Sequence, residues 1–267
     1  MKKILSVICC AVVLIFMFIP ILILAVYSFT DASNIGQAMN FSIENYRVLF
    51  TTPELIDMIV GTIVLAVGSA LIATVLGTMG AMGAFYSRRT ARGLYNTVNQ
   101  IPIVNAEVVT GFSICVLMIA FLGMSKESFV PLVIGHVVLL SPFVFLSVMP
   151  RLKQMDRSLY EAALDLGATS GQAIFKVTIP QILPGILSGF MLAITLSLDD
   201  YFITTYTKPP TFDTISTYVV NATRGSQTQI KTALWALSTL IFVFVVLIVV
   251  LMNVVGKNKG RKGNVKI

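Results

Sequence analysis

Three acidic side chains lie inside long apolar stretches of this 267-residue sequence, Glu107 and the adjacent pair Asp199 and Asp200. A carboxylate in the interior of a bilayer is costly, so such residues usually face a cavity or a partner. No Lys or Arg lies at a matching depth in these stretches. Three acids without cationic partners suit the binding of a multivalent organic cation. The alternatives are a structural hydrogen-bond network and a position near the external mouth of a path.

Aromatic and imidazole side chains lie in the same kind of surroundings. Tyr201 follows the acidic pair, and Phe202 and Tyr206 come next. Their rings could add cation–π contacts to a bound amine, or they could form an aromatic belt at the membrane interface. For His136, the only histidine, we expect a hydrogen-bonded packing role, with a polar residue along a path as the alternative.

The elements that hold these residues must be membrane helices. The chain is 56% hydrophobic and only 12% charged, whereas a soluble domain carries about 25% charged residues. A spanning helix needs about 20 apolar residues. The sequence therefore predicts an all-α, polytopic membrane protein with a single transmembrane domain, 1–267, of about six helices. The expected spans are 4–28, 55–86, 98–123, 129–149, 184–207 and 232–255.

The basic residues indicate orientation. The net charge is +7, but Lys and Arg cluster at the ends of the apolar runs and in the last eleven residues. This pattern is typical of membrane topology, so we expect lipid contacts and no nucleic-acid partner. With both termini in the cytoplasm, the cytoplasmic segments hold most of the 19 basic residues. The polar segment 151–181 then also faces the cytoplasm.

Segment 151–181 begins with the pattern of a short helix. Ser158 and Glu161 have capping-box spacing, with Asp156 as a competing N-cap. Gly167 follows where a helix C-cap favours positive φ.

A second helix is predicted directly after that glycine. It has a capping-box pattern at Thr169–Gln172 and should stop near Thr178, because Pro180 disfavours helical geometry at the residue before it. From these residues alone, the segment is either a docking element for a cytoplasmic partner or a plain connecting loop.

The same segment contains Glu161-Ala162-Ala163, then Gly167, then Val177-Thr178-Ile179-Pro180. This pattern resembles the EAA loop of ABC importer permeases, with Val177 and Ile179 in place of Ile and Leu as the departures. The resemblance implies a type I ABC importer permease (MetI-like) fold, in which this loop docks on a separate ATPase. The sequence has no G-x-x-x-x-G-K-[ST] pattern, so we expect a transport subunit and not an enzyme. We expect no catalytic residue, metal site or cofactor in this chain, and ATP and Mg on the partner ATPase. The residues that match the motif, and so carry the predicted coupling role, are Glu161, Ala162, Ala163, Gly167, Val177, Ile179 and Pro180.

Two further stretches, 193–200 and 45–50, are similar to the second permease subunit of spermidine/putrescine importers. This resemblance implies polyamine import across a bacterial inner membrane. The implied partners are a homologous B-type permease, two ATPase copies and an external polyamine-binding protein. Another organic cation or a metal chelate is an alternative cargo, and an ion-coupled secondary transporter is an alternative class of protein. The predicted substrate path contains Glu107, Asp199, Asp200 and Tyr201.

Overall fold

The computed structural model describes residues 2–32, 40–156, 158–224, 232–243 and 246–247. These residues are mostly helical, and their one β-type pairing is an isolated bridge between Thr30 and Phe41. The all-α prediction is therefore confirmed. The chain divides into two compact units, one of Met1–Asp57 with Val219–Ile267 and the other of Met58–Tyr218.

The first unit is built around α1 (Lys2–Ser28) and a helix at Thr232–Val243. The rings of Tyr27 and Trp235 meet edge to face, with centroids 5.6 Å apart. The helix α2 (Glu44–Thr51) follows, and the side-chain amide of Asn45 donates to the carbonyls of Ser28 and Thr30. This amide ties α2 to the end of α1.

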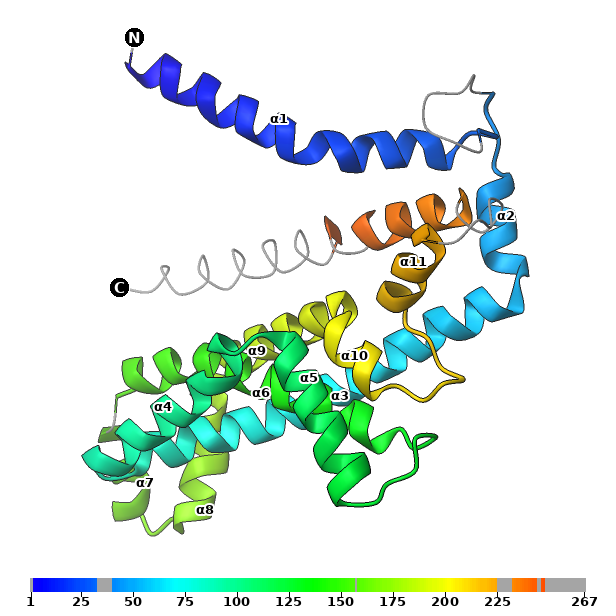
Figure 1. Cartoon of the computed structure of the whole chain (residues 1–267). Coiled ribbons are helices and arrows are strands. Elements are labelled where there is room, and N and C mark those ends of the chain that lie inside the picture. Colours follow the sequence, from blue (N-terminus) through cyan, green and yellow to red (C-terminus); the bar gives the residue numbers. More distant parts are fainter. Residues whose placement is uncertain (1, 33–39, 157, 225–231, 244–245, 248–267) are drawn as a thin grey trace. The chain divides into compact units, whose positions relative to one another are not determined.

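The second unit contains three long helices, α3 (Pro53–Tyr86, from Met58 onward), α6 (Val130–Gln154) and α9 (Ile179–Asp199). The helices α6 and α9 lie side by side (Figure 1). Small residues let the helices approach closely. The core of this unit combines alanines of α3 with larger side chains of α6 and α9, among them Ala70, Ala73, Ala81, Leu140, Val144, Val148 and Ile182.

Within the described residues, four helical stretches are long and apolar enough to cross a membrane: Cys9–Ser28, Pro53–Tyr86, Val130–Gln154 and Ser170–Asp199. A bent pair of helices, Arg89–Val104 and Glu107–Phe121, would form a fifth span. The predicted span 232–255 begins as the helix Thr232–Val243 and continues outside the described residues.

Two predicted spans are not continuous helices, which corrects the boundaries at 98–123 and 184–207. The first is divided into α4 (Arg89–Val104) and α5 (Glu107–Cys115), and α5 continues as the π-helix η1 (Val116–Phe121). The chain bends by 99° between α4 and the helix formed by α5 and η1. The second ends at Asp199, and a separate short helix, α10 (Phe202–Thr207), follows. At each interruption extended backbone replaces helix, at Asn105–Ala106 and at Asp200.

The predicted stop near Thr178 is also wrong. The short helix α8 (Ser170–Ala173) continues through a π-helix, η2 (Ile174–Thr178), directly into α9. Ile179 keeps helical angles, and its N–H bonds to the carbonyl of Ile174, five residues back. The wider π turn accommodates Pro180, which lacks an N–H and would crowd the previous turn of a regular α-helix.

Candidate functional site

The two interrupted spans pack against each other through α5 and α10. Ile203 of α10 is fully buried between two glycines. A Cβ atom built on Gly111 of α5 would lie 3.0 Å from the Cα of Ile203, and one built on Gly135 of α6 would lie 2.6 Å from its Cγ2. Only glycine allows this approach, and it brings the two helix interruptions into one region of the molecule.

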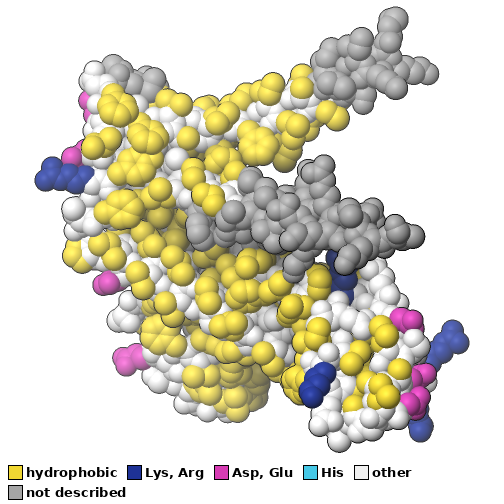
Figure 2. All heavy atoms as spheres, turned by 180° about the vertical axis from the view of Figure 1, so that it is seen from behind, with side chains coloured by type: hydrophobic (Ala, Val, Ile, Leu, Met, Phe, Trp, Pro, Cys, Tyr) yellow, Lys and Arg dark blue, Asp and Glu magenta, His cyan; other side chains and the backbone are white. Residues whose placement is uncertain are grey.

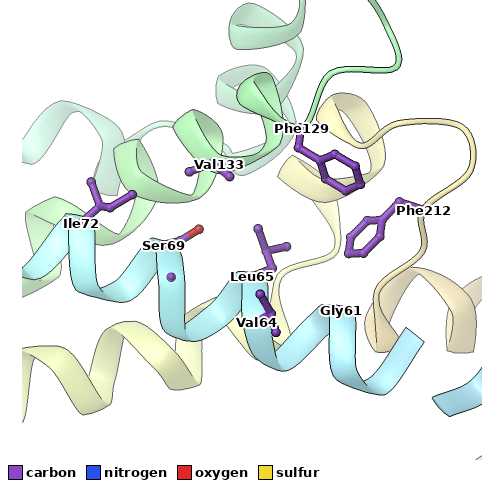
Figure 3. A pocket seen from close by; sticks show the side chains of 9 residues that line it. Gly61, Val64, Leu65, Ser69, Ile72, Phe129, Val133 and Phe212 are labelled. Carbon is purple, nitrogen blue, oxygen red and sulfur yellow. The ribbon is translucent and has the colours of Figure 1, made fainter. Parts of the chain in front are cut away.

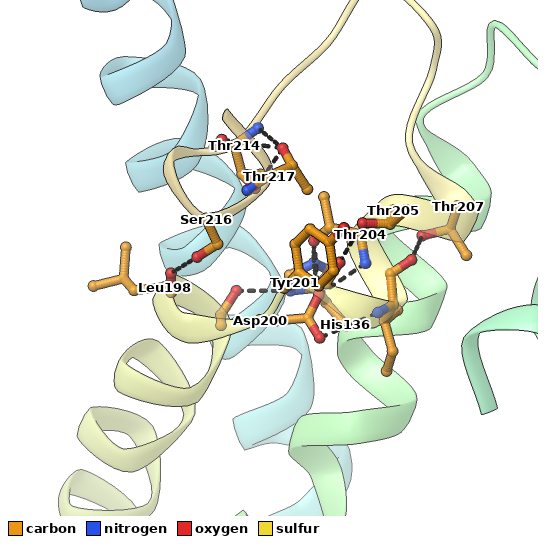
Figure 4. Close-up of polar contacts among 12 residues, drawn as sticks. His136, Leu198, Asp200, Tyr201, Thr204, Thr205, Thr207, Thr214, Ser216 and Thr217 are labelled. Carbon is orange, nitrogen blue, oxygen red and sulfur yellow. Dashed lines mark hydrogen bonds and ion pairs between the residues drawn. The ribbon is translucent and has the colours of Figure 1, made fainter. Parts of the chain in front are cut away.

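Asp200 closes the N-terminal end of α10. Its carboxylate accepts hydrogen bonds from the backbone N–H of Thr204 at 2.8 Å, the hydroxyl of Thr204 at 2.7 Å and the N–H of Ile203 at 3.3 Å (Figure 4). The residue is only 5% exposed. These contacts satisfy backbone donors that the first turn of a helix leaves open. Asp200 therefore has a clear structural role.

His136 joins this group from α6. The fully buried ring has Nδ1 2.8 Å from the hydroxyl of Ser197 and Nε2 3.0 Å from the hydroxyl of Thr204. The Thr204 hydroxyl donates its hydrogen to Asp200, so it accepts from Nε2–H, which leaves Nδ1 to accept from Ser197. The hydrogen-bonded packing role expected for His136 is confirmed.

Asp199 and Glu107 lie in different surroundings. Asp199 is the last residue of α9, Glu107 is the first of α5, and both side chains are exposed. Neither Asp199 nor Glu107 forms an ion pair with another described residue, and Lys208, just beyond α10, is bound to Asp213 at 2.8 Å. Asp200 is therefore held by hydrogen bonds, whereas Asp199 and Glu107 have no ion-pair partner among the described residues.

Tyr201 follows directly on this acidic pair. Its half-buried ring packs edge to face with that of Phe202 at 5.2 Å. Ser216 completes the region by donating to the carbonyl of Leu198, near the end of α9.

The predicted coupling segment forms a second polar region. Its first helix, α7 (Ser158–Asp165), ends just before Gly167, whose φ is +85° as the C-cap pattern predicts. The N–H of Ala168 donates to the carbonyl of Ala163, and the N–H of Gly167 donates to the carbonyl of Leu164. These two bonds form a complete Schellman motif.

The other caps of this segment are also formed. The backbone of Ser158 donates to the carboxylate of Asp156, so the competing N-cap is the one in use. Hydrogen bonds from Ser158 lower the pKa of Asp156 below its usual value. The capping box of Thr169 and Gln172 is complete. In Figure 2 charged side chains gather around α7 and α8.

Comparison with known proteins now identifies the family. Residues 73–259 match the family model of the binding-protein-dependent transport system inner membrane component. The chain belongs to this family. It is thus a multi-pass inner-membrane subunit of a transport system, and the expectation of a transport subunit and not an enzyme is confirmed.

Individual relatives of this permease cover most of its length. It is 31% identical over 233 residues to the putrescine transport system permease protein PotI of Escherichia coli (strain K12), with 85% of this chain and 81% of PotI covered. It is 27% identical over 254 residues to the spermidine/putrescine transport system permease protein PotC of the same strain, with 94% of each covered. The fold is that of a subunit of a bacterial ABC transporter for alginate import, with a TM-score of 0.72, 19% identity and 94% of each chain covered.

The permease also has an apolar cavity of about 340 Å³ between α3, the start of α6 and the segment after α10 (Figure 3). Val64, Leu65, Phe129 and Phe212 line it, and Ser69 supplies a hydroxyl. No described carboxylate reaches this cavity, so a cation entering it would lose its hydration without compensation. The helix interruptions are therefore the better candidate site.

Sequence reasoning missed several residues of the permease site. Asn105 donates to the hydroxyl of Thr110 across the first interruption, much as Asp200 binds Thr204 across the second. For Ser197 and Thr204, which bind His136, the sequence signal was a hydroxyl residue close to Asp200 within an apolar run. The close approach of Ile203 to its two glycines had no local signal. The contact of the EAA-like residues with an ATPase and the contact of the acids with a substrate stay predictions.

Proposed function

We propose that this chain is the permease subunit of an ATP-driven polyamine importer. The observation that carries the proposal is the pair of exposed carboxylates, Glu107 and Asp199, at adjoining helix interruptions, neither of which forms an ion pair with a described residue. The similarity to permeases named for putrescine and spermidine supports this choice of cargo. The proposed partners are a homologous B-type permease, two copies of an ATPase and an external polyamine-binding protein.

The chemistry of a polyamine fits this arrangement. A polyamine carries two or more ammonium groups separated by methylene chains, so separate carboxylates can each bind one end. Tyr201 follows two residues after Asp199, and an aromatic ring face can bind an ammonium group. Within the described residues, no three His, Cys, Asp or Glu side chains form a group that could hold a metal ion. The site therefore favours an extended organic cation over a bare metal ion.

The two adjacent aspartates divide the work. The sequence predicts both in the path, and in the structure Asp200 accepts three hydrogen bonds from α10. We assign Asp200 and His136 to holding the helix interruption in place, and Asp199 and Glu107 to contact with substrate. A fixed interruption keeps the two free carboxylates aimed at one path.

Coupling to ATP follows from helix continuity. Residues Ser170–Asp199 form one helical stretch, which begins in the predicted coupling segment and ends at a proposed substrate ligand. With segment 151–181 facing the cytoplasm, closure of the ATPase pair would displace α7 and α8 and tilt α9. ATP and Mg stay on the ATPase, and the two conformations of that partner bias the position of Asp199.

Uptake of labelled putrescine and spermidine tests the proposal in cells that lack this chain. The intact chain should restore uptake, and excess unlabelled polyamine should compete with it. Asp199→Asn should reduce uptake roughly tenfold or more, since hydrogen bonds to charged groups contribute about 1.5–3 kcal/mol. Asp199→Glu should retain part of the activity, and Glu127→Gln, at another exposed turn, should retain all of it.

Three results would count against this function. Normal uptake by Asp199→Asn would remove this carboxylate from the path. Competition by other cations or metal chelates, but not by polyamines, would change the cargo. Uptake that follows an ion gradient and persists when the ATPase is inactivated would indicate a secondary transporter.

A further inference from the structure

We propose that Tyr86 is a positioning residue that joins α3 to the coupling segment, so that movement of α7 reaches α3 as well as α9. The proposal deepens the coupling role assigned above and rests on it. It adds a second mechanical connection, made by side chains, to the continuous helix Ser170–Asp199.

Tyr86 contacts two separate parts of the coupling segment. It is the last residue of α3, and its ring centroid lies 5.3 Å from that of Tyr160 on α7. Its hydroxyl lies 3.3 Å from the hydroxyl of Thr178, which is fully buried in η2. One side chain therefore bridges the end of a long apolar helix, the first coupling helix and the root of α9.

The end of α3 that carries Tyr86 is itself well anchored. Arg92 of α4 donates to the backbone carbonyls of Ala84 and Phe85, and its guanidinium lies 5.8 Å from the centre of the Phe85 ring. A cation at a helix C-terminus satisfies open carbonyls and complements the helix dipole. Phe85 in turn packs edge to face with Tyr86 at 5.2 Å. A force applied to the Tyr86 ring would therefore act on α3 and α4 together.

The coupling helix α7 is packed loosely beyond this contact. None of its residues is buried. A cavity of about 390 Å³ lies beside it, lined by residues that include Tyr86, Arg92, Tyr160 and Glu161. Residues of α7 and of the end of α3 both line this space, and the aromatic pair of Tyr86 and Tyr160 joins the two elements directly.

Thr178 gives the connection its second branch. It lies in the π turn, where the helix is wider than a regular α-helix, and such turns frequently occur at functional sites. Tyr86 thus holds α7 through its ring and the π turn through its hydroxyl. The two contacts can be removed separately, which makes the proposal testable.

The test uses the whole transporter, with its permease partner, ATPase and binding protein, in proteoliposomes. ATP hydrolysis and labelled putrescine uptake are measured in the same vesicles. Tyr86→Ala should raise the ATP hydrolysed per putrescine transported about fivefold or more, the lower end of typical coupling between sites. Tyr86→Phe keeps the ring and should raise the ratio only about twofold. Tyr95→Ala, which removes an exposed tyrosine of α4, should leave the ratio unchanged.

A structural role alone predicts a different result. It would lower the amount of assembled transporter without changing the ratio, so an unchanged ratio in Tyr86→Ala overturns the proposal. If the transporter with Tyr86→Ala does not assemble, the same ratio is measured for Tyr160→Ala. An unchanged ratio in that variant also overturns the proposal. Thr178→Val should match Tyr86→Phe, and combining the two should add nothing, because both remove the same hydrogen bond.

An error in the polyamine assignment can be distinguished from an error in the Tyr86 proposal. If the intact transporter shows no putrescine uptake, the polyamine assignment is wrong. Stimulation of ATP hydrolysis by the binding protein can still be compared between the intact chain and Tyr86→Ala. Loss of that stimulation supports the Tyr86 connection, and full stimulation contradicts it.

Discussion

The two polar regions of the second unit are stabilised in opposite ways. In the coupling segment, the caps at Asp156, Gly167 and Thr169 join residues two to five positions apart and lie at the surface. At the helix interruptions, His136 binds hydroxyls 61 and 68 residues away and is completely buried. The first region holds its shape through its own sequence, whereas the second needs three helices to be in place.

This difference suits the two proposed roles. The caps of this segment bond only to its own residues, so it can shift as a unit without breaking them, as a docking element must. A site whose hydrogen bonds cross between helices keeps its geometry only while those helices stay packed. The carboxylates of Glu107 and Asp199 therefore take their relative position from the packing of α5, α9 and α10.

The largest effect should separate the two neighbouring aspartates. Asp200→Ala removes the acceptor for the N–H and hydroxyl of Thr204 and should destabilise the protein by about 3 kcal/mol. Asp199→Ala, at an exposed position, should change stability by less than about 0.5 kcal/mol while uptake is lost. Thermal unfolding of the purified complex and the yield of assembled complex measure the difference. Equal losses of stability in the two variants would contradict the division of roles.

An intermediate effect should come from the glycines that surround Ile203. Gly111→Ala and Gly135→Ala should each cost about 1–3 kcal/mol, since both overfill a tight contact. In an Ile203→Ala background, the cost of Gly135→Ala should fall by about 1 kcal/mol or more, because the obstructing Cγ2 is gone. The cost of Gly111→Ala should remain, because the new Cβ at position 111 meets the Cα of residue 203, which Ile203→Ala does not remove. Thermal unfolding of the single and double variants measures these costs. An equal reduction of both costs by Ile203→Ala would contradict the contacts described for Ile203.

The smallest effect belongs to the coupling segment. Gly167→Ala should cost about 1 kcal/mol, because its positive φ is unfavourable for a residue with a Cβ. No atom lies within 4 Å of a Cβ built on Gly167, so the cost is purely conformational. Gly171→Ala is the matched control, with equally open space and no positive φ, and should cost nothing. Hydrogen exchange at Ala168 measures the local change, and equal protection in the two variants would refute the interpretation.

The sequence was informative where structure is determined locally. The glycine C-cap and the Thr169 capping box follow from residues within a few positions of each other, and both are formed. The apolar runs correctly indicated a helical membrane protein. The EAA-like spacing and the 193–200 stretch pointed to the permease family that the comparison confirms.

The remaining features depend on long-range contacts or on backbone adjustments without a sequence signal. Pro180 suggested a helix stop, but the π turn before it lets the helix continue. Asp200 looked equivalent to Asp199, and only the position of Thr204 shows that one is buried and the other free. The approach of Ile203 to Gly111 and Gly135 joins helices that are far apart in the chain.

The helix α9 has 21 residues, which corresponds to a length of about 32 Å. As a rigid lever pivoting near the π turn, it would convert a tilt of about 5° into a displacement of about 3 Å at Asp199. That displacement is about the length of one hydrogen bond. A very small rotation at the coupling end is therefore enough to bring the Asp199 carboxylate into contact with a passing ammonium group or to withdraw it.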